Sequence, residues 1–318
     1  MNENNTLYIV VPCYKEQEVL PETSRRLKEK VLALRAQGKI SDKSRIMFVN
    51  DGSSDNTWPI IRQLHEQEPD LFSGVNLSRN RGHRNALLAG LLTAVNYADM
   101  IISMDADLQN DINAVDAMVD HYHEGYEVVY GVRSKRDTDT FFKRFTAEGF
   151  YKVMKALCVD IVFNHADYRL MSRRAVEGLA QFGEVNLFLR GIVPQIGYKW
   201  TTVTYERAER FAGESKYPLK KRLAFAADGI TSFSVKPIRM VFSLGVVVFL
   251  VSLVMLLYAL VAKLTGHTSA GWTSLMGSIW LIGGIQLLSL GVVGEYVGKI
   301  YKEAKHRPRF IIESVLNK

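Results

Sequence analysis

Short apolar runs alternate with longer amphipathic stretches over the first 130 residues of the chain. The runs at 7–11 and 45–49 are compact and bounded by turn-forming residues, which predicts buried strands. Further strands are predicted at 74–77, 100–104 and 127–130, and helices at 18–37, 55–67, 85–98 and 112–124. Strands that alternate with helices in this way predict an α/β fold with a mostly parallel sheet and right-handed crossovers.

Two long stretches near the C-terminal end, 241–262 and 270–294, carry no charged residue. At ~1.5 Å per residue, a 22-residue helix spans roughly 33 Å, which is enough for the apolar core of a bilayer. This length favours two membrane spans over a pair of buried core helices. Lysine and arginine residues flank the outer ends of both stretches, whereas the connection at 263–269 carries only Lys263 and His267. By the positive-inside rule both ends face the cytoplasm, so we expect a multi-pass protein of the inner (plasma) membrane.

The positive charge of the chain is concentrated beside these two stretches. The formal net charge is +7, and the basic residues that flank the stretches suit anionic lipid headgroups. Residues 215–235 are amphipathic and basic, which fits either a helix in the membrane interface or an ordinary docking helix. No nucleic-acid partner is expected, because we find no basic face with interleaved aromatic residues. The N-terminal region is expected to stay in the cytosol, because its first apolar run is too short for a signal peptide.

Two carboxylates stand at the end of the fourth predicted strand. Asp105 and Asp107 follow the mostly apolar run 101–104, and ligands of open α/β sheets bind outside the carboxyl ends of the strands. Acids one residue apart at such a point can share a divalent cation, and the cation can neutralise a diphosphate. A solvated turn is the alternative interpretation of this tripeptide, and three other segments argue against it.

The first two of these segments follow the first and second predicted strands. Pro12 is expected to turn the chain out of the sheet, which exposes Glu16 at the edge where ligands bind. Asp51 ends the second strand, and its carboxylate can accept the N3–H of uracil or the N1–H/N2–H pair of guanine. Gly52 is expected to let a planar ring approach the backbone. These features predict a binding site for a nucleotide base.

The third segment, 78–86, carries three arginines beside the start of a predicted helix. A helix N-terminus and clustered positive charge attract anions, so this corner suits a diphosphate. His83 lies within the segment, and its residue type leaves two interpretations open, a diphosphate contact or a polar loop residue.

In this order and spacing, Val-Pro-x-Tyr-x-Glu, Asn-Asp-Gly-Ser-Ser-Asp-Asn-Thr, Asn-x-Gly-x-x-x-Ala and Asp-Ala-Asp-Leu-Gln resemble the motifs of family 2 glycosyltransferases of the GT-A fold. Residues 167–173, 210–218 and 228–234 resemble the polyisoprenyl-phosphate branch, which contains dolichol-phosphate mannose synthases and bacterial bactoprenol glucosyltransferases. The resemblance covers nearly the whole chain and is closest to the bactoprenol glucosyltransferase type. One departure is the run 111–113, where the family often shows prolines.

With this resemblance, the sequence divides into four parts. A cytosolic GT-A glycosyltransferase domain is expected at 1–214 and a juxtamembrane amphipathic segment at 215–237. A two-helix transmembrane hairpin is expected at 238–296, followed by a basic cytosolic tail at 297–318.

The resemblance also implies roles for individual residues. The nucleotide sugar is expected to contact Pro12, Tyr14, Glu16, Asp51, Asn80, Gly82, Asp105 and Gln109. Asp105 and Asp107 would hold Mg²⁺ or Mn²⁺ on the donor diphosphate, and Asp167 would face the acceptor in the place usually given to the base. Catalysis is expected from Asp167, Asp107 and Arg210. Acceptor and phosphate binding is expected from Arg133, Arg169, Ser215 and Lys216.

The implied reaction is the inverting transfer of one sugar, glucose from UDP-glucose as first choice, to polyisoprenyl (undecaprenyl) phosphate on the cytosolic face. N-acetylglucosamine, galactose-type sugars and mannose from GDP-mannose stay open. A phosphate monoester is largely ionised at neutral pH, since its second pKa is about 6. Asp167 is therefore expected to orient the acceptor, or to take a residual proton, rather than to remove a difficult one. The resemblance further implies a homo-oligomer, with a tetramer as one arrangement, a downstream flippase and a transferase that decorates a surface glycan.

Three other functions fit the sequence less well. A processive polysaccharide synthase would need more spans and a Gln-x-x-Arg-Trp element, which the sequence does not contain. A non-catalytic membrane-anchored binding or scaffold protein would be favoured by the loss of Asp105 or Asp107, and both are present. A transporter component would leave the large soluble domain unexplained.

Overall fold

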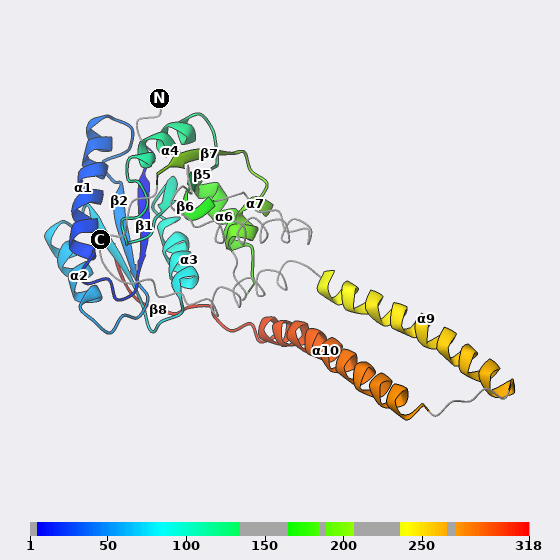
Figure 1. The fold of residues 1–318 in the computed structure, drawn as a ribbon. Helices are drawn as coiled ribbons and strands as arrows, with labels where there is room; N and C mark the ends of the chain where they lie inside the picture. The colour runs from blue at the N-terminus through cyan, green and yellow to red at the C-terminus, as the bar shows by residue number, and fades with distance from the viewer. Residues whose placement is uncertain (1–4, 134–164, 185–188, 207–235, 266–270, 318) are drawn as a thin grey trace. The chain divides into compact units, whose positions relative to one another are not determined.

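The computed structural model describes residues 5–133, 165–184, 189–206, 236–265 and 271–317 (Figure 1). These residues fall into two compact units. The sheet unit contains the described residues up to 206 together with those from Arg307 onward, and the helical unit contains the described residues from Lys236 to His306.

The sheet unit is built on one eight-stranded sheet with the strand order β7-β5-β6-β4-β1-β2-β3-β8. Its strands are β1 (Leu7–Cys13), β2 (Arg45–Asn50), β3 (Phe72–Leu77), β4 (Met100–Ser103), β5 (Val128–Arg133), β6 (His165–Ser172), β7 (Trp200–Tyr205) and β8 (Ile312–Leu316). Strand β1 pairs in parallel with β2 and β4, whereas β6 and β8 run antiparallel to the strands they pair with. The predicted α/β fold with a mostly parallel sheet is confirmed, and all five predicted strands are present.

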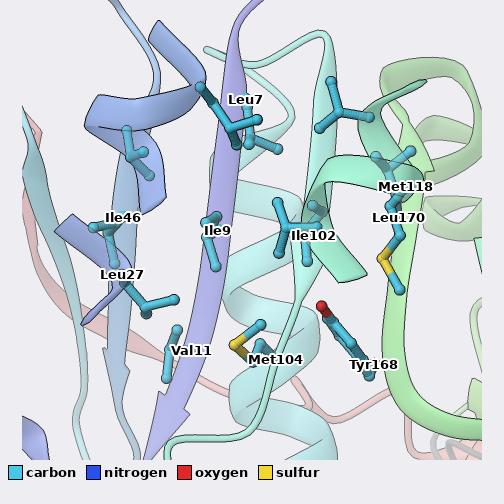
Figure 2. Packing of buried hydrophobic residues seen from close by; sticks show 14 of the residues in the cluster. Leu7, Ile9, Val11, Leu27, Ile46, Ile102, Met104, Met118, Tyr168 and Leu170 are labelled. Atoms are coloured by element: carbon cyan, nitrogen blue, oxygen red, sulfur yellow. The ribbon is translucent and has the colours of Figure 1, made fainter. Parts of the chain in front are cut away.

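Helices connect the strands of this unit and cover both faces of the sheet. They are α1 (Leu20–Ala36), α2 (Thr57–Gln67), α3 (His83–Ala94), α4 (Ala114–His123), α6 (Arg173–Ala180) and α7 (Leu189–Gln195). The cluster that the sheet shares with α1 and α4 contains Leu7, Ile9, Val11, Leu27, Ile102 and Met118 (Figure 2). Val10 points to the opposite face, where a Cβ on Gly90 of α3 would lie 2.4 Å from its Cγ1. Glycine at that position therefore lets α3 lie directly on β1.

Pro12 does not end the first strand, in contrast to the expectation from the sequence. Strand β1 continues to Cys13, and Pro12 pairs with Val49 of β2. The backbone N–H and C=O groups of successive β1 residues point in turn to β4 and to β2: the oxygen of Val10 accepts the N–H of Met104, and that of Cys13 accepts the N–H of Asp51. The backbone nitrogen of Pro12 therefore points to the β4 side. The pairing with β4 has already ended there, at Val10 with Ser103. A proline is tolerated because the N–H that it lacks would have had no partner strand.

The C-terminal residues also differ from the predicted basic tail at 297–318. Helix α10 (Trp272–Ala304) contains the first part of that segment, and β8 lies in the last part. Strand β8 pairs antiparallel with β3, with Val315 opposite Val75. The sequence gives no strand signal there, because residues 311–316 set a polar pair, Glu313 and Ser314, between two apolar pairs instead of alternating, and the charged run 299–309 precedes them.

The helical unit contains α9 (Lys236–Leu264) and α10, which include the charge-free stretch 241–262 and residues 272–294 of the second one. Within the described residues, one helical stretch, Leu281–Ala304, is long and apolar enough to cross a membrane. Two transmembrane helices are therefore not confirmed. Most of the predicted juxtamembrane segment lies outside the described residues.

Candidate active site

The candidate site lies at the carboxyl ends of the parallel strands, as the sequence predicts. Asp51 follows β2 there and is only 2% exposed. Its Oδ1 accepts a hydrogen bond of 2.7 Å from the backbone N–H of Arg81, and its Oδ2 one of 2.9 Å from that of Gly82. Burial raises the pKa of Asp51, and these two N–H groups reduce the rise without cancelling it. Asp51 thus holds the loop after β3 against the end of β2.

Gly52 has a different role from the one expected. Its φ is +59°, and a Cβ there would lie 2.4 Å from the carbonyl carbon of Arg79 and from the backbone nitrogen of Asn80. The backbone of the next loop therefore fills the space in which we expected a planar ring. Asn80 itself is exposed at this edge.

The turn after β1 is fastened to the loop after β2. The N–H of Lys15 donates to Ser53 Oγ at 3.1 Å, and the N–H of Glu16 donates to Thr57 Oγ1 at 3.0 Å. Lys15 has a φ of +56°, an uncommon conformation for a residue with a Cβ. Tyr14 is 39% exposed on the same turn. Two of the residues predicted to contact the nucleotide, Tyr14 and Glu16, are therefore placed by hydrogen bonds to the neighbouring loop.

His83 binds one of the two predicted metal ligands. It is the first residue of α3, and its Nε2 lies 2.9 Å from Oδ1 of Asp105, which follows β4. Burial lowers the pKa of His83, but the hydrogen bond and charge of Asp105 outweigh it, so the pKa is raised. Burial likewise raises the pKa of Asp105, but His83 outweighs that effect and the pKa is lowered. The pairing keeps Asp105 ionised at neutral pH, which a metal ligand requires.

Asp105 and Asp107 fit a divalent cation in their chemistry. Both are partly exposed at the open sheet edge, and Asp107 Oδ1 also accepts the N–H of Gln109 at 3.2 Å. Carboxylate oxygens are the ligands that Mg²⁺ and Mn²⁺ prefer. Within the described residues, no group of three or more His, Cys, Asp or Glu side chains is placed to hold a metal. The protein would supply only part of the coordination shell, and a diphosphate and water would complete it, which is usual for Mg²⁺.

Strand β6 brings Asp167 to the same place. It pairs antiparallel with β4, with Ser103 opposite Arg169. Continuing this register by two residues beyond Ser103 sets Asp105 opposite Asp167. The hydroxyl of Ser103 also donates to the backbone oxygen of Asp167. Asp167, the predicted acceptor-facing residue, therefore lies near Asp105, the predicted metal ligand that follows the adjacent strand β4.

Two arginines hold the carboxylate of Asp167. Nη2 of Arg169 lies 2.8 Å from its Oδ1, and Arg190 of α7 approaches Oδ1 through Nε at 3.3 Å and Oδ2 through Nη2 at 3.2 Å. Burial raises the pKa of Asp167, but Arg190 and Arg169 outweigh it and hold the pKa far below its usual range. Asp167 is therefore a stable carboxylate and a poor proton acceptor at neutral pH.

The structure describes some of the remaining predicted residues and not others. Arg169 is 1% exposed and lies beneath Asp167, whereas Arg190, which the sequence did not single out, is 36% exposed beside it. Arg133 is the last residue of β5. Arg210, Ser215 and Lys216 lie outside the described residues. No sequence motif pointed to Arg190, because its role depends on where α7 packs.

A parallel sheet with paired carboxylates at its ligand edge is the arrangement of a GT-A glycosyltransferase. The chain belongs to glycosyl transferase family 2, whose model matches residues 8–179, and the model of the GtrB C-terminal hairpin matches residues 236–300. The family resemblance in the sequence motifs is confirmed, and the protein is a glycosyltransferase.

Relatives match over almost the full chain. An uncharacterized glycosyltransferase, YkoT of Bacillus subtilis, is 52% identical over 96% of this chain and 91% of its own length. The bactoprenol glucosyl transferase of Shigella phage SfV is 38% identical over 96% of this chain and 97% of its own length. Among solved structures, the mannosyltransferase PcManGT of Pyrobaculum calidifontis, in complex with GDP-Man and Mn²⁺, has a TM-score of 0.46 and 16% identity, and the match covers 96% of this chain and 88% of that chain.

Proposed function

We propose that this glycosyltransferase moves one sugar from a nucleotide-diphosphate sugar, with UDP-glucose as the first candidate, to polyisoprenyl phosphate. The observation that carries the proposal is the carboxylate of Asp167, which two arginines hold and whose charge acts on Asp105 just beyond the end of β4. Support for the acceptor comes from relatives that are named bactoprenol glucosyl transferase and are 38% identical over nearly the whole chain. UDP-N-acetylglucosamine and GDP-mannose are the alternative donors.

The donor diphosphate would lie over Asp105 and Asp107, which would hold Mg²⁺ or Mn²⁺. When bound, the metal stabilises negative charge on the departing diphosphate. His83 keeps Asp105 ionised and fixes its direction, because its ring nitrogen binds one of the two carboxylate oxygens. The nucleotide base would lie between the turn that carries Tyr14 and Glu16 and the loop that Asp51 holds, with Gln109 and the loop around Asn80 at the sides.

The acceptor phosphate would approach Asp167 and the arginines that hold it. Arg190 is the more exposed of the two arginines, so its guanidinium is the positive charge that could contact a phosphate monoester. The acceptor is ionised at neutral pH and needs no strong base to activate it. Asp167 therefore directs Arg190 toward the acceptor, and the reaction gains mainly from positioning. Direct in-line attack on the sugar inverts the configuration of the anomeric carbon.

The proposal includes the cellular setting that the sequence predicts. Helices α9 and α10 would both cross the inner membrane, the sheet unit would work on the cytosolic face, and residues 215–237 would lie along the interface. The arrangement keeps the long acceptor lipid in the bilayer while its phosphate meets a cytosolic site. A homo-oligomer, with a tetramer as one arrangement, and a downstream flippase and surface-glycan transferase belong to the same proposal.

A donor screen tests the reaction. Purified full-length protein with Mn²⁺ or Mg²⁺ and undecaprenyl phosphate is incubated in parallel with radiolabelled UDP-glucose, UDP-N-acetylglucosamine, UDP-galactose and GDP-mannose. We expect one donor to give a butanol-extractable product that requires the metal and disappears in Asp105→Ala. Label that stays in the aqueous phase with every donor would contradict the proposed acceptor or donor set. Absence of nucleotide binding would instead support a membrane-anchored scaffold.

A further inference from the structure

A chain of side-chain hydrogen bonds connects the C-terminal strand to the turn beside the nucleotide edge. Nδ2 of Asn76 in β3 donates to Oε2 of Glu313 in β8 at 2.7 Å. Nδ2 of Asn50 in β2 donates to Oδ1 of Asn76 at 2.7 Å, and the backbone N–H of Ser53 donates to Oδ1 of Asn50 at 3.2 Å. We call these four residues the amide relay. It links Glu313 in β8 to Ser53 in the turn after β2 through two intervening asparagine side chains.

The amide relay has a direction that Glu313 determines. An ionised carboxylate can only accept hydrogen bonds, so Asn76 must present its NH₂ group to Glu313. Asn76 then offers only its carbonyl oxygen to Asn50, which in turn offers its own oxygen to Ser53. Asn50 is 2% exposed and Asn76 is 8% exposed, so water cannot easily replace a missing partner. Reversing one amide would set two donors against each other.

The far end of the amide relay supports the proposed nucleotide site. Ser53 uses its backbone N–H to bind Asn50 and its hydroxyl oxygen to accept the N–H of Lys15. Lys15 lies between Tyr14 and Glu16, and Ser53 lies two residues after Asp51. The amide relay therefore supports Ser53, which in turn holds the turn that carries Tyr14 and Glu16 on one side of the proposed base site.

We propose that Glu313 is a positioning residue for the nucleotide site, acting through the amide relay. The proposal rests on the proposed function, because it places the nucleotide at these turns. Backbone pairing between β3 and β8 runs from Gly74 to Leu77, so the strand itself has other support. Changing the Glu313 side chain should consequently alter the turns near Ser53 more than it alters the sheet.

Three variants of the full-length protein separate these effects. Glu313→Lys replaces an acceptor by a donor and opposes the direction of the amide relay. Glu313→Gln keeps an acceptor oxygen and serves as the conservative variant. Glu66→Lys makes the same charge change at an exposed position of α2. UDP affinity is measured by calorimetry with Mn²⁺, and KM is measured for the donor and for undecaprenyl phosphate.

We expect Glu313→Lys to weaken UDP binding and raise the donor KM roughly 3- to 10-fold, the size of one ordinary hydrogen bond. The KM for the lipid should not change, and Glu313→Gln and Glu66→Lys should stay within about 2-fold of the parent protein. Equal UDP affinity in Glu313→Lys and Glu66→Lys would overturn the proposal.

Hydrogen exchange provides a readout that does not depend on the nucleotide. In Glu313→Lys, amides in peptides covering 50–57 and 13–17 should exchange faster, whereas β8 and the melting temperature should be unchanged. Faster exchange throughout β8 with a lower melting temperature would give Glu313 a purely structural role and overturn the proposal. If the parent protein binds neither UDP nor GDP, the proposed donor class fails, while the exchange at 50–57 still decides the role of Glu313.

Discussion

Removing the carboxylate of Asp167 should destabilise the sheet unit through Arg169. Arg169 is 1% exposed and its guanidinium binds Asp167 at 2.8 Å. In Asp167→Leu this charge would stay buried without its partner, a change that costs roughly 3–5 kcal/mol. Because 1 kcal/mol shifts the melting temperature of a domain of this size by about 2–4 °C, we expect a fall of roughly 6–20 °C.

The double variant Asp167→Leu/Arg169→Met tests this reasoning. Methionine removes the unpaired charge and keeps most of the side-chain volume, so the double variant should melt at a higher temperature than Asp167→Leu alone. Thermal unfolding of the full-length protein in detergent, followed by circular dichroism, measures both. Asp70→Asn is the control, because that aspartate side chain is 95% exposed. A double variant that melts no later than the single variant would refute an uncompensated Arg169 charge as the cause.

Four further outcomes are expected. In Asp167→Asn the carboxylate charge that directs Arg190 is lost, so turnover should fall at least 10-fold, and near-parent turnover would remove the proposed positioning role. Arg190→Gln should raise the KM for undecaprenyl phosphate about 10-fold and leave the donor KM unchanged; equal changes in both would contradict its place at the acceptor. His83→Phe should lower the apparent affinity for Mn²⁺ roughly 10-fold in a metal titration of activity, because Asp105 loses the group that orients it. The lowered pKa of Asp167 stabilises the folded state above its unfolded pKa of about 3.9, so melting temperature should decline as the pH falls below about 4, and this decline should be smaller in Asp167→Leu; an equal decline in the variant would contradict this contribution.

The sequence predicts the centre of the sheet unit well because local pattern and burial agree there. The run 7–11 is apolar at every position, as expected for a strand covered on both faces, and β1 is buried throughout. The sequence also predicts the acidic pair after β4, because a strand end followed by two carboxylates is a local feature. The expectation for Pro12 is wrong because a proline ends a strand only where its nitrogen faces a paired neighbour, and that depends on where β4 ends.

The parts of the site that the sequence does not predict depend on contacts between distant segments. Asp105 and Asp167 are 62 positions apart, and only the antiparallel course of β6 sets them opposite each other. The sequence does not decide between a ligand contact and a loop residue for His83, because its partner depends on where α3 starts relative to β4. The space over Gly52 is filled by a loop almost 30 residues later, which residue type alone cannot indicate.

Strand β8 also protects the sheet from other copies of the chain. Every residue of β3 is buried, and β8 covers the side of β3 that does not face β2. Without β8, β3 would present a row of unpaired backbone groups and apolar side chains, which is a template for pairing between molecules. Protein truncated before 312 should therefore self-associate, so an affinity tag for purification is better placed at the N-terminus than directly after β8.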